Sequence, residues 1–256
     1  MRSLAAIMVL ITVVASPSAR PSDLDKERRW AEQVVDSLLD GEAIYLNDGR
    51  NDFLAIETAS AEPSGDKAAV IMHGTGVHPN WPTVVQPLRV GLTGSGWHTL
   101  SIQMPVLANE AKHEEYAAIY DWVPGRIDAA VAHLRQQGFA KVVLIAHSQG
   151  STMTAYYFSQ PHQPVDGFVA IGMSGGSGGG PMDALSRLRG IDVPMLDLYG
   201  SEDLPEVLAS VEARAAQGGG PGRDYTQQRV EGADHFFEGE EEPLIEAVNA
   251  WLNTRY

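Results

Sequence analysis

The sequence contains no cysteine and comparatively few basic residues. Without cysteine the chain can form no disulfide and carries no thiol for lipid attachment, so its stability must come from its core. Its 18 Lys and Arg residues face 33 Asp and Glu residues, which gives a formal net charge of −15. Such a surface repels phosphate backbones and anionic lipid. We therefore expect no nucleic acid among the partners.

Motifs for metal ions and nucleotide cofactors are missing as well. The eight histidines include no H-E-x-x-H pair or comparable ligand spacing. The glycine-rich stretches GTG and GGSGGG lie outside the strand–turn–helix setting of a dinucleotide or phosphate loop. We accordingly expect no metal and no cofactor. What the sequence does have is 44% apolar residues over 256 positions, which is enough for a substantial core.

The N-terminus has the pattern of an export signal. Arg2 is followed by an apolar run from Leu4 to Ala15, and then by small residues and a proline. This run is too short to cross a membrane comfortably but suits the core of a signal peptide. We expect a signal peptide over residues 1–19, cleaved after Ser18 or Ala19, and one domain over 20–256. The mature protein would then be periplasmic or extracellular, without stable membrane insertion. An uncleaved membrane anchor is the alternative.

From residue 23 onward, helical and strand patterns alternate. A helix at 23–41 precedes short strands at 42–46, 52–59 and 68–72. Then follow helix 83–96, strand 98–104, helix 123–138, strand 140–146, helix 150–160, strands 166–173 and 193–199, helix 204–217, strand 224–231 and helix 242–255. This alternation predicts an α/β fold with a doubly wound, mostly parallel sheet and helices on both faces. Antiparallel strands at the N-terminal edge are compatible with it.

The stretch AHSQG joins the strand at 140–146 to the next helix. Ser148 therefore lies at the carboxyl end of a parallel strand, where ligands meet such sheets. Ala146 and Gly150, two positions before and after it, are small enough for a tight strand-to-helix turn. The pattern is that of a nucleophile elbow, G-x-S-x-G, with Ala in place of the first glycine. Ser148 is the candidate nucleophile; the alternative is a serine that only caps the helix.

A serine nucleophile needs a base, and the base needs a carboxylate to orient it. In an elbow of this kind the chain order is serine, acid, histidine. Asp203 follows the strand at 193–199, and His235 follows the strand at 224–231. We expect Ser148, Asp203 and His235 to form a catalytic triad. Glu202 remains a second candidate for the acid, and His235 could instead cap a local loop.

An oxyanion hole needs two N–H donors beside the nucleophile. The backbone N–H of Gln149 is one candidate, since this residue follows the serine. Thr75, in the turn HGTG after the strand at 68–72, would supply the second. Gly74 and Gly76 allow its backbone a close approach. The alternative is an ordinary glycine turn with His73 facing the core.

The stretches HGTG, AHSQG, YGSEDLPEV and GADHFF together resemble the α/β-hydrolase superfamily across essentially the whole mature chain. More narrowly, HGTGVHPNWPTVVQPLRVGLTGSGWHTLSIQMP is similar to exported bacterial α/β-hydrolase-like proteins without an assigned function. The resemblance implies a serine hydrolase with a Ser–His–Asp triad. Many lipases of the superfamily insert a helical cap after the strand that here spans 166–173. This chain has the glycine-rich SGGSGGGPMDALSRLRG there, so we expect no large lid domain.

The function predicted from these features is that of a secreted serine esterase. It would hydrolyse a small-molecule carboxylic ester through an acyl-enzyme, with thioesters or amides as variants of the substrate. A non-catalytic envelope or binding protein that keeps the fold is the alternative from a different class. The presence of all the catalytic groups, each after the expected strand, favours the enzyme.

Overall fold

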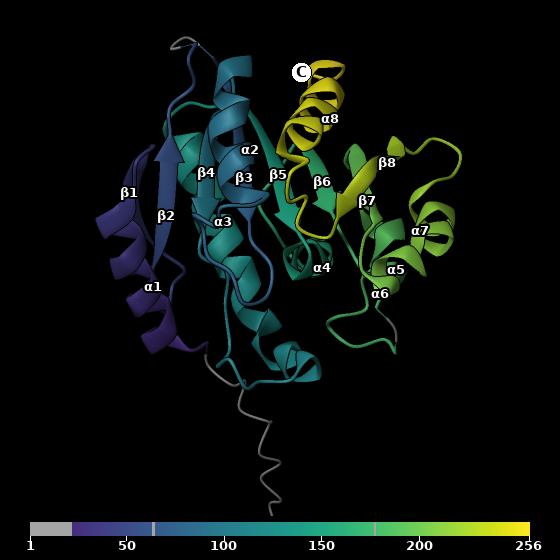
Figure 1. Ribbon diagram of the computed structural model, residues 1–256, viewed down its shortest axis with the longest axis horizontal. Coiled ribbons are helices and arrows are strands. Elements are labelled where there is room, and N and C mark those ends of the chain that lie inside the picture. The colour runs from purple at the N-terminus through teal and green to yellow at the C-terminus, as the bar shows by residue number, and fades with distance from the viewer. Residues whose placement is uncertain (1–21, 63–64, 177) are drawn as a thin grey trace, which may run out of the picture.

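The protein is built around one eight-stranded sheet (Figure 1). The structure is a computed structural model and describes residues 22–62, 65–176 and 178–256. The strand order is β1-β2-β4-β3-β5-β6-β7-β8. The strands are β1 (Glu42–Asn47), β2 (Asp52–Thr58), β3 (Lys67–Met72), β4 (His98–Ile102), β5 (Lys141–His147), β6 (Gly167–Ile171), β7 (Met195–Glu202) and β8 (Tyr225–Asp234). The strands from β3 to β8 are parallel, whereas β2 is antiparallel to both of its neighbours. The predicted fold class is confirmed.

Helices cover both faces of the sheet. The α-helices are α1 (Leu24–Ser37), α2 (Val85–Gly91), α3 (Val123–Gln136), α4 (Gln149–Tyr157), α5 (Ala184–Arg187), α6 (Pro205–Leu208), α7 (Val211–Gly218) and α8 (Glu241–Asn253). The 3₁₀ helices are η1 (Leu92–Ser95), η2 (His113–Trp122) and η3 (Leu188–Gly190). Val142 and Leu144 of β5 pack in the cluster with α3 and α4, and Val143 and Ile145 in the cluster with α2 and α8. Because both faces are buried, β5 has an unbroken apolar sequence.

The first helix shows how local sequence and packing agree. Asp23 caps α1, since its carboxylate accepts a hydrogen bond from the Lys26 backbone N–H at 3.0 Å. Ala31 and Val34 form the buried stripe of the helix and pack on β2. The helix spacing of these apolar residues thus places α1 against the antiparallel edge of the sheet.

One predicted helix, at 204–217, is divided in the structure into α6 and α7. Ser210 lies at the break, where its hydroxyl donates to the Val207 carbonyl at 2.9 Å and accepts from the Gly175 N–H at 3.1 Å. The buried Arg214 side chain donates to the same Val207 carbonyl at 2.8 Å. These side chains replace the backbone partners that a continuous helix would supply, so the helix can end there. As a result α6 is a separate turn directly after β7.

The strands β7 and β8 both extend further than their apolar patterns predict. They remain paired as far as Glu202 and Asp234, with a register shift between Gly200 and Glu202. Asp203 and His235 are therefore the first residues beyond the ends of two neighbouring strands. This pairing brings together two residues that are 32 positions apart in the sequence.

The predicted signal peptide at residues 1–19 lies outside the residues that the structure describes, and it stays a prediction. Within 22–62, 65–176 and 178–256, no helix combines the length and the apolar character needed to cross a membrane.

Candidate active site

Ser148 occupies a strained turn between β5 and α4. Its φ of 55° and ψ of −125° put a non-glycine residue in the left-handed half of φ/ψ space. Such a conformation costs on the order of 1–3 kcal/mol and persists only where the surrounding structure enforces it. Here the Ser148 N–H donates to the Ile171 carbonyl of β6 at 2.8 Å. In this described turn its hydroxyl makes no capping hydrogen bond to α4. This argues against the alternative interpretation, in which the Ser148 side chain only caps the helix.

Two glycines make room for this turn. A Cβ at Gly74 would lie 2.7 Å from the Ser148 Cβ, and a Cβ at Gly150 would lie 2.6 Å from the His73 carbonyl oxygen. Both distances are shorter than a van der Waals contact. Neither neighbour can move away to relieve the clash, because one is a short side chain and the other is backbone. Gly74 and Gly150 are therefore required by close approach. The sequence pattern predicted Gly150 as a small position beside Ser148, and Gly74 as a position of close backbone approach in the HGTG turn.

His235 lies between the other two members of the predicted triad. Its Nε2 is 2.8 Å from the Ser148 Oγ, and its Nδ1 is 2.6 Å from the Asp203 Oδ1. A carboxylate can only accept, so Nδ1 carries the proton and Nε2 is left to accept from the serine hydroxyl. The three side chains thus form one hydrogen-bonded chain, with the distances that a nucleophile and its base require.

Asp203, and not Glu202, is the carboxylate that contacts the histidine. Its side chain is buried, and its oxygens also accept from the backbone N–H groups of Leu204 at 2.7 Å and Gly200 at 3.3 Å. Glu202 is exposed at the end of β7, opposite Asp234 of β8. Glu202 is exposed while the adjacent Asp203 is buried against His235, so the two neighbouring side chains point in different directions.

The two residues predicted to form the oxyanion hole lie beside Ser148. Thr75 and Gln149 line the same cleft as the serine. Their side chains are joined, since the Thr75 hydroxyl donates to the Gln149 Oε1. In the described part of the chain, neither backbone N–H donates to another protein group. Both N–H groups are therefore available to a ligand oxygen.

A second layer of hydroxyl groups behind Gln149 was not foreseen from the sequence. The Thr152 hydroxyl donates to the Gln149 carbonyl at 2.9 Å, and so accepts from the Tyr120 hydroxyl at 2.6 Å. Tyr120 comes from η2 and is fully buried. It joins η2 to the first turn of α4, the turn that carries the Gln149 N–H. A tyrosine in an irregular stretch gives no sequence signal for such a role.

Two buried histidines hold the loops of the site. The His73 Nε2 accepts from the Met104 N–H at 2.9 Å, so its Nδ1–H donates to the Gly74 carbonyl at 2.8 Å. The His147 Nε2–H donates to the His235 carbonyl at 2.8 Å. Burial lowers the pKa of His73 to about 3 and that of His147 to about 4, so both rings stay neutral near pH 7. Each neutral ring orients a loop of the site.

The lowered pKa values of these two buried imidazoles predict that the protein loses stability in acid. Both pKa values lie below the ordinary value of 6.5, so the unfolded chain takes up protons that the folded chain excludes. The free energy of unfolding is then highest above about pH 6.5 and falls as the pH drops towards 4. At about 1.4 kcal/mol per pH unit, each ring removes roughly 2 kcal/mol between pH 7.5 and pH 5.

Urea unfolding at a series of pH values measures this loss. The variant His147→Gln keeps an N–H donor but removes one titrating ring, so its stability should fall less steeply with acid than that of the parent. His162 is exposed, and His162→Gln is the matched control that should leave the slope unchanged. Equal slopes in all three proteins would contradict the prediction.

Ser148 opens into a cleft of about 320 Å³ at the carboxyl ends of the parallel strands. The lining residues come from six segments: Thr75; Ala111, His113 and Tyr116; Ser148, Gln149 and Thr152; Gly172 and Ser174; Leu204, Glu206 and Val207; and His235 and Phe236. The segment between β4 and α3 forms one wall through Ala111, His113 and Tyr116, and it lies at the lower end of the view in Figure 1. Among the described residues between β6 and β7, namely 172–176 and 178–194, the helices are the short α5 and η3, and there is no larger helical cap.

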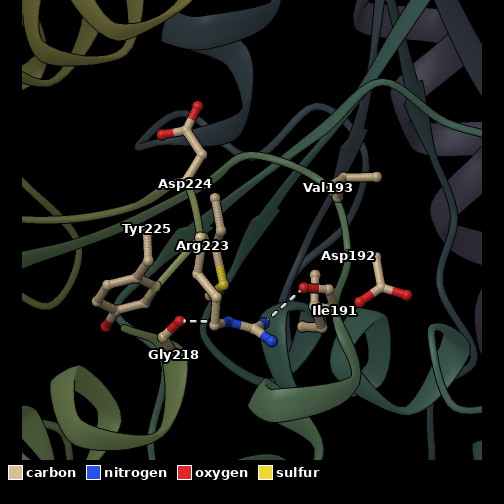
Figure 2. Close-up of a pocket in the computed structure, with 9 residues that line it drawn as sticks. Ile191, Asp192, Val193, Gly218, Arg223, Asp224 and Tyr225 are labelled. Atoms are coloured by element: carbon tan, nitrogen blue, oxygen red, sulfur yellow. Dashed lines mark hydrogen bonds between the residues drawn. The ribbon is translucent and has the colours of Figure 1, made fainter. Parts of the chain in front are cut away.

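Another hollow, at the amino ends of the strands and so opposite to the cleft, is structural. Figure 2 shows this space of about 80 Å³, beside the first residues of β7 and β8. Arg223 extends into it and donates to the carbonyls of Gly218 at 2.7 Å and Ile191 at 2.6 Å. The guanidinium thereby supplies hydrogen-bond donors to carbonyls at the ends of α7 and η3.

The described residues contain no group of three or more His, Asp or Glu placed to hold a metal ion.

Comparison with solved structures identifies the fold. Est1E from Butyrivibrio proteoclasticus is 14% identical with a TM-score of 0.66, and the match covers 84% of this chain and 99% of that one. An alpha-beta serine hydrolase homologue from Coxiella burnetii is 18% identical with a TM-score of 0.63, covering 83% and 98%. A dienelactone hydrolase from Anabaena variabilis is 18% identical with a TM-score of 0.61, covering 84% and 98%. The chain has the α/β-hydrolase fold.

Sequence comparison adds one family. A family model described as "Protein of unknown function (DUF3530)" matches residues 12–123 and 109–254. No curated protein gives a significant sequence match.

Proposed function

The chain belongs to the family described as "Protein of unknown function (DUF3530)", and from the geometry of its cleft we propose that it is a serine hydrolase that cleaves carboxylic esters. One observation carries the proposal. The hydroxyl of a strained Ser148 faces a cleft and is hydrogen-bonded, through His235, to the buried carboxylate of Asp203. A serine with a merely structural role needs neither the base nor the acid behind it.

The first half of the reaction forms an acyl-enzyme. The Ser148 Oγ attacks the ester carbonyl carbon while the His235 Nε2 takes the hydroxyl proton. The carbonyl oxygen becomes an oxyanion, which accepts from the N–H groups of Thr75 and Gln149. Asp203 stabilises the imidazolium that forms. When the C–O bond to the alcohol breaks, the Nε2 proton passes to the leaving oxygen and the acyl group remains on Ser148.

The second half returns the serine. Water attacks the acyl carbon, and the His235 Nε2 takes one of its protons. The second tetrahedral oxyanion is held by the same two N–H groups. Collapse breaks the bond to the Ser148 Oγ, which recovers its proton from the imidazolium, and the carboxylic acid leaves. No group besides those of the chain and water is needed to balance either half.

Fluorophosphonate labelling of the purified protein tests the proposal directly. The probe phosphonylates a serine only when a base activates it, whatever the natural substrate is. We expect one label, on the peptide that contains Ser148, and no label on Ser148→Ala. Absence of labelling in the parent would favour the alternative function, a non-catalytic envelope or binding protein with the same fold.

The size of the cleft predicts a preference for short acyl chains. A space of about 320 Å³ without a helical cap offers little apolar cover to a long chain. We expect kcat/KM for p-nitrophenyl esters to fall from the short to the long end of a series from acetyl to palmitoyl, without activation at lipid–water interfaces. A maximum at palmitoyl would contradict this account of the cleft.

Export of the protein belongs to the proposal as well. The N-terminal pattern predicts a leader over residues 1–19, and a periplasmic or extracellular enzyme would meet small esters outside the cytoplasm. N-terminal sequencing of the protein recovered from cell fractions tests the cleavage and the location together.

A further inference from the structure

The loops that frame the cleft are acidic. The segments 108–115, 202–206 and 234–242 each contribute lining residues. Apart from Glu110, the acidic residues in these segments are Glu114, Glu115, Glu202, Asp203, Glu206, Asp234, Glu238, Glu240, Glu241 and Glu242. Glu110 belongs to the first segment too, but it lies beside Lys26 and Arg29 at another hollow. Lys112 is the only Lys or Arg in these three segments. Loops that are rich in charges of one sign give the cleft beside them a potential that attracts the opposite sign and repels its own.

In the described part of the chain, the walls of the cleft hold no lysine or arginine that would offset this potential. Among the described lining residues, Glu206 is the carboxylate that is exposed to solvent. The remaining polar groups of the wall are hydroxyl, amide and imidazole groups. A substrate with a carboxylate would therefore enter without a partner for its charge, which is costly in a partly desolvated site.

Two apolar side chains lie at the mouth of the same cleft. Leu204 follows the acid Asp203, and Phe236 follows the base His235. Both line the cleft, yet Leu204 is 39% exposed and Phe236 is 38% exposed. Large apolar side chains that stay exposed around a pocket are surfaces that a ligand can cover. Their position beside the acid and the base places that surface next to Ser148.

We propose that the cleft selects esters that bear an apolar group and no negative charge. Glu206 and the acidic loops disfavour anionic esters, and Leu204 with Phe236 binds the apolar group. Uncharged and cationic esters are thus the substrate class of the site. This inference rests on the proposed esterase function, since it concerns which esters reach Ser148.

Three aryl acetates of matched shape test the charge selection. They are phenyl acetates with a meta tert-butyl, trimethylammonio or carboxylate group, so the acyl group is the same in each. Each kcat/KM is divided by the rate constant for hydroxide-catalysed hydrolysis of that ester, which corrects for leaving-group reactivity. At low salt we expect the carboxylate ester to be disfavoured about tenfold against the tert-butyl ester. The trimethylammonio ester should be at least as good as the tert-butyl ester.

Salt and single variants identify the source of the selection. Salt at about 0.5 M shortens the Debye length to a few ångströms, so the tenfold gap should shrink. Glu206→Gln should improve the carboxylate ester about threefold relative to the tert-butyl ester, as the loss of one nearby charge predicts. Glu246→Gln makes the same change on the exposed part of α8 and should leave the ratio unchanged.

A matched pair of leucine variants, Leu204→Ser and Leu208→Ser, tests the apolar contact. Leu204→Ser should raise KM for the tert-butyl ester about fivefold, because the variant lacks the apolar surface that the bound ester covers on Leu204 in the parent. Leu208 is 37% exposed and does not line the cleft. Leu208→Ser makes the same chemical change and should leave KM unchanged. Fluorophosphonate labelling of each variant shows that it is folded and active.

Two results would overturn the inference while leaving the esterase in place. One is a carboxylate ester that is hydrolysed as well as its tert-butyl counterpart at low salt. The other is a ratio that Glu206→Gln and Glu246→Gln change equally. A parent protein that is neither labelled nor able to hydrolyse any of the three esters would instead remove the proposed function, and the inference with it.

Discussion

Ser148→Ala and His235→Ala are each expected to lower kcat for ester hydrolysis by a factor on the order of 10⁶. The serine supplies the electrons of the new bond and the histidine removes its proton, so neither acts without the other. Their 2.8 Å hydrogen bond is the contact through which this proton moves. The double variant should therefore be no worse than either single variant, because the two losses are one and the same. Single-turnover and steady-state rates with an aryl acetate measure all three.

The stability of these variants separates catalysis from structure. Ser148 fills no core position and makes no capping hydrogen bond in its described turn. His235 is buried and is the partner of the buried Asp203 carboxylate, so His235→Ala should cost more stability than Ser148→Ala. For Ser148→Ala the free energy of unfolding should stay within about 1–2 kcal/mol of the parent, as usual for substitutions outside the core. If Ser148→Ala kept its activity and lost several kcal/mol of stability, the serine would be a structural residue and the proposed function would fail.

Asp203→Asn is expected to lower kcat by a factor on the order of 10⁴. The Asp203 Oδ1 lies 2.6 Å from the His235 Nδ1 and keeps the proton there. An asparagine can turn its NH₂ group towards Nδ1, which then becomes the acceptor and leaves the proton on Nε2. A protonated neutral Nε2 cannot take the proton of Ser148. The asparagine amide can still occupy the same space, so the protein should remain folded.

Glu202→Gln is the matched control for this variant. It makes the same change from carboxylate to amide at the adjacent position, on a side chain that is exposed at the end of β7. We expect kcat to change by less than about threefold, because a single exposed charge is screened by solvent. If Glu202→Gln were the damaging substitution and Asp203→Asn the mild one, the acid would be Glu202.

Much of the fold could be predicted from local patterns. The alternation of helix and strand segments predicted a parallel sheet, since the sequence of β5 is apolar at every position from Val142 to Ala146. The order of AHSQG, Asp203 and His235 along the chain, each after a strand, predicted which side chains would meet. These predictions succeed because the periodicity of a strand and the geometry of a tight turn depend on neighbouring residues alone.

The sequence by itself thus determined the mostly parallel sheet and the elbow at Ser148. It also reduced the partners of the serine to His235 as the base and Asp203 or Glu202 as the acid. Tertiary structure decided the rest. The pairing of β7 with β8 selected Asp203 over Glu202, and Ser210 with the buried Arg214 divided the helix after β7. Packing of six segments brought Leu204 and Glu206 to the cleft. Each of these outcomes depends on contacts between distant parts of the chain, which a local pattern does not encode. Only the folded chain specifies them.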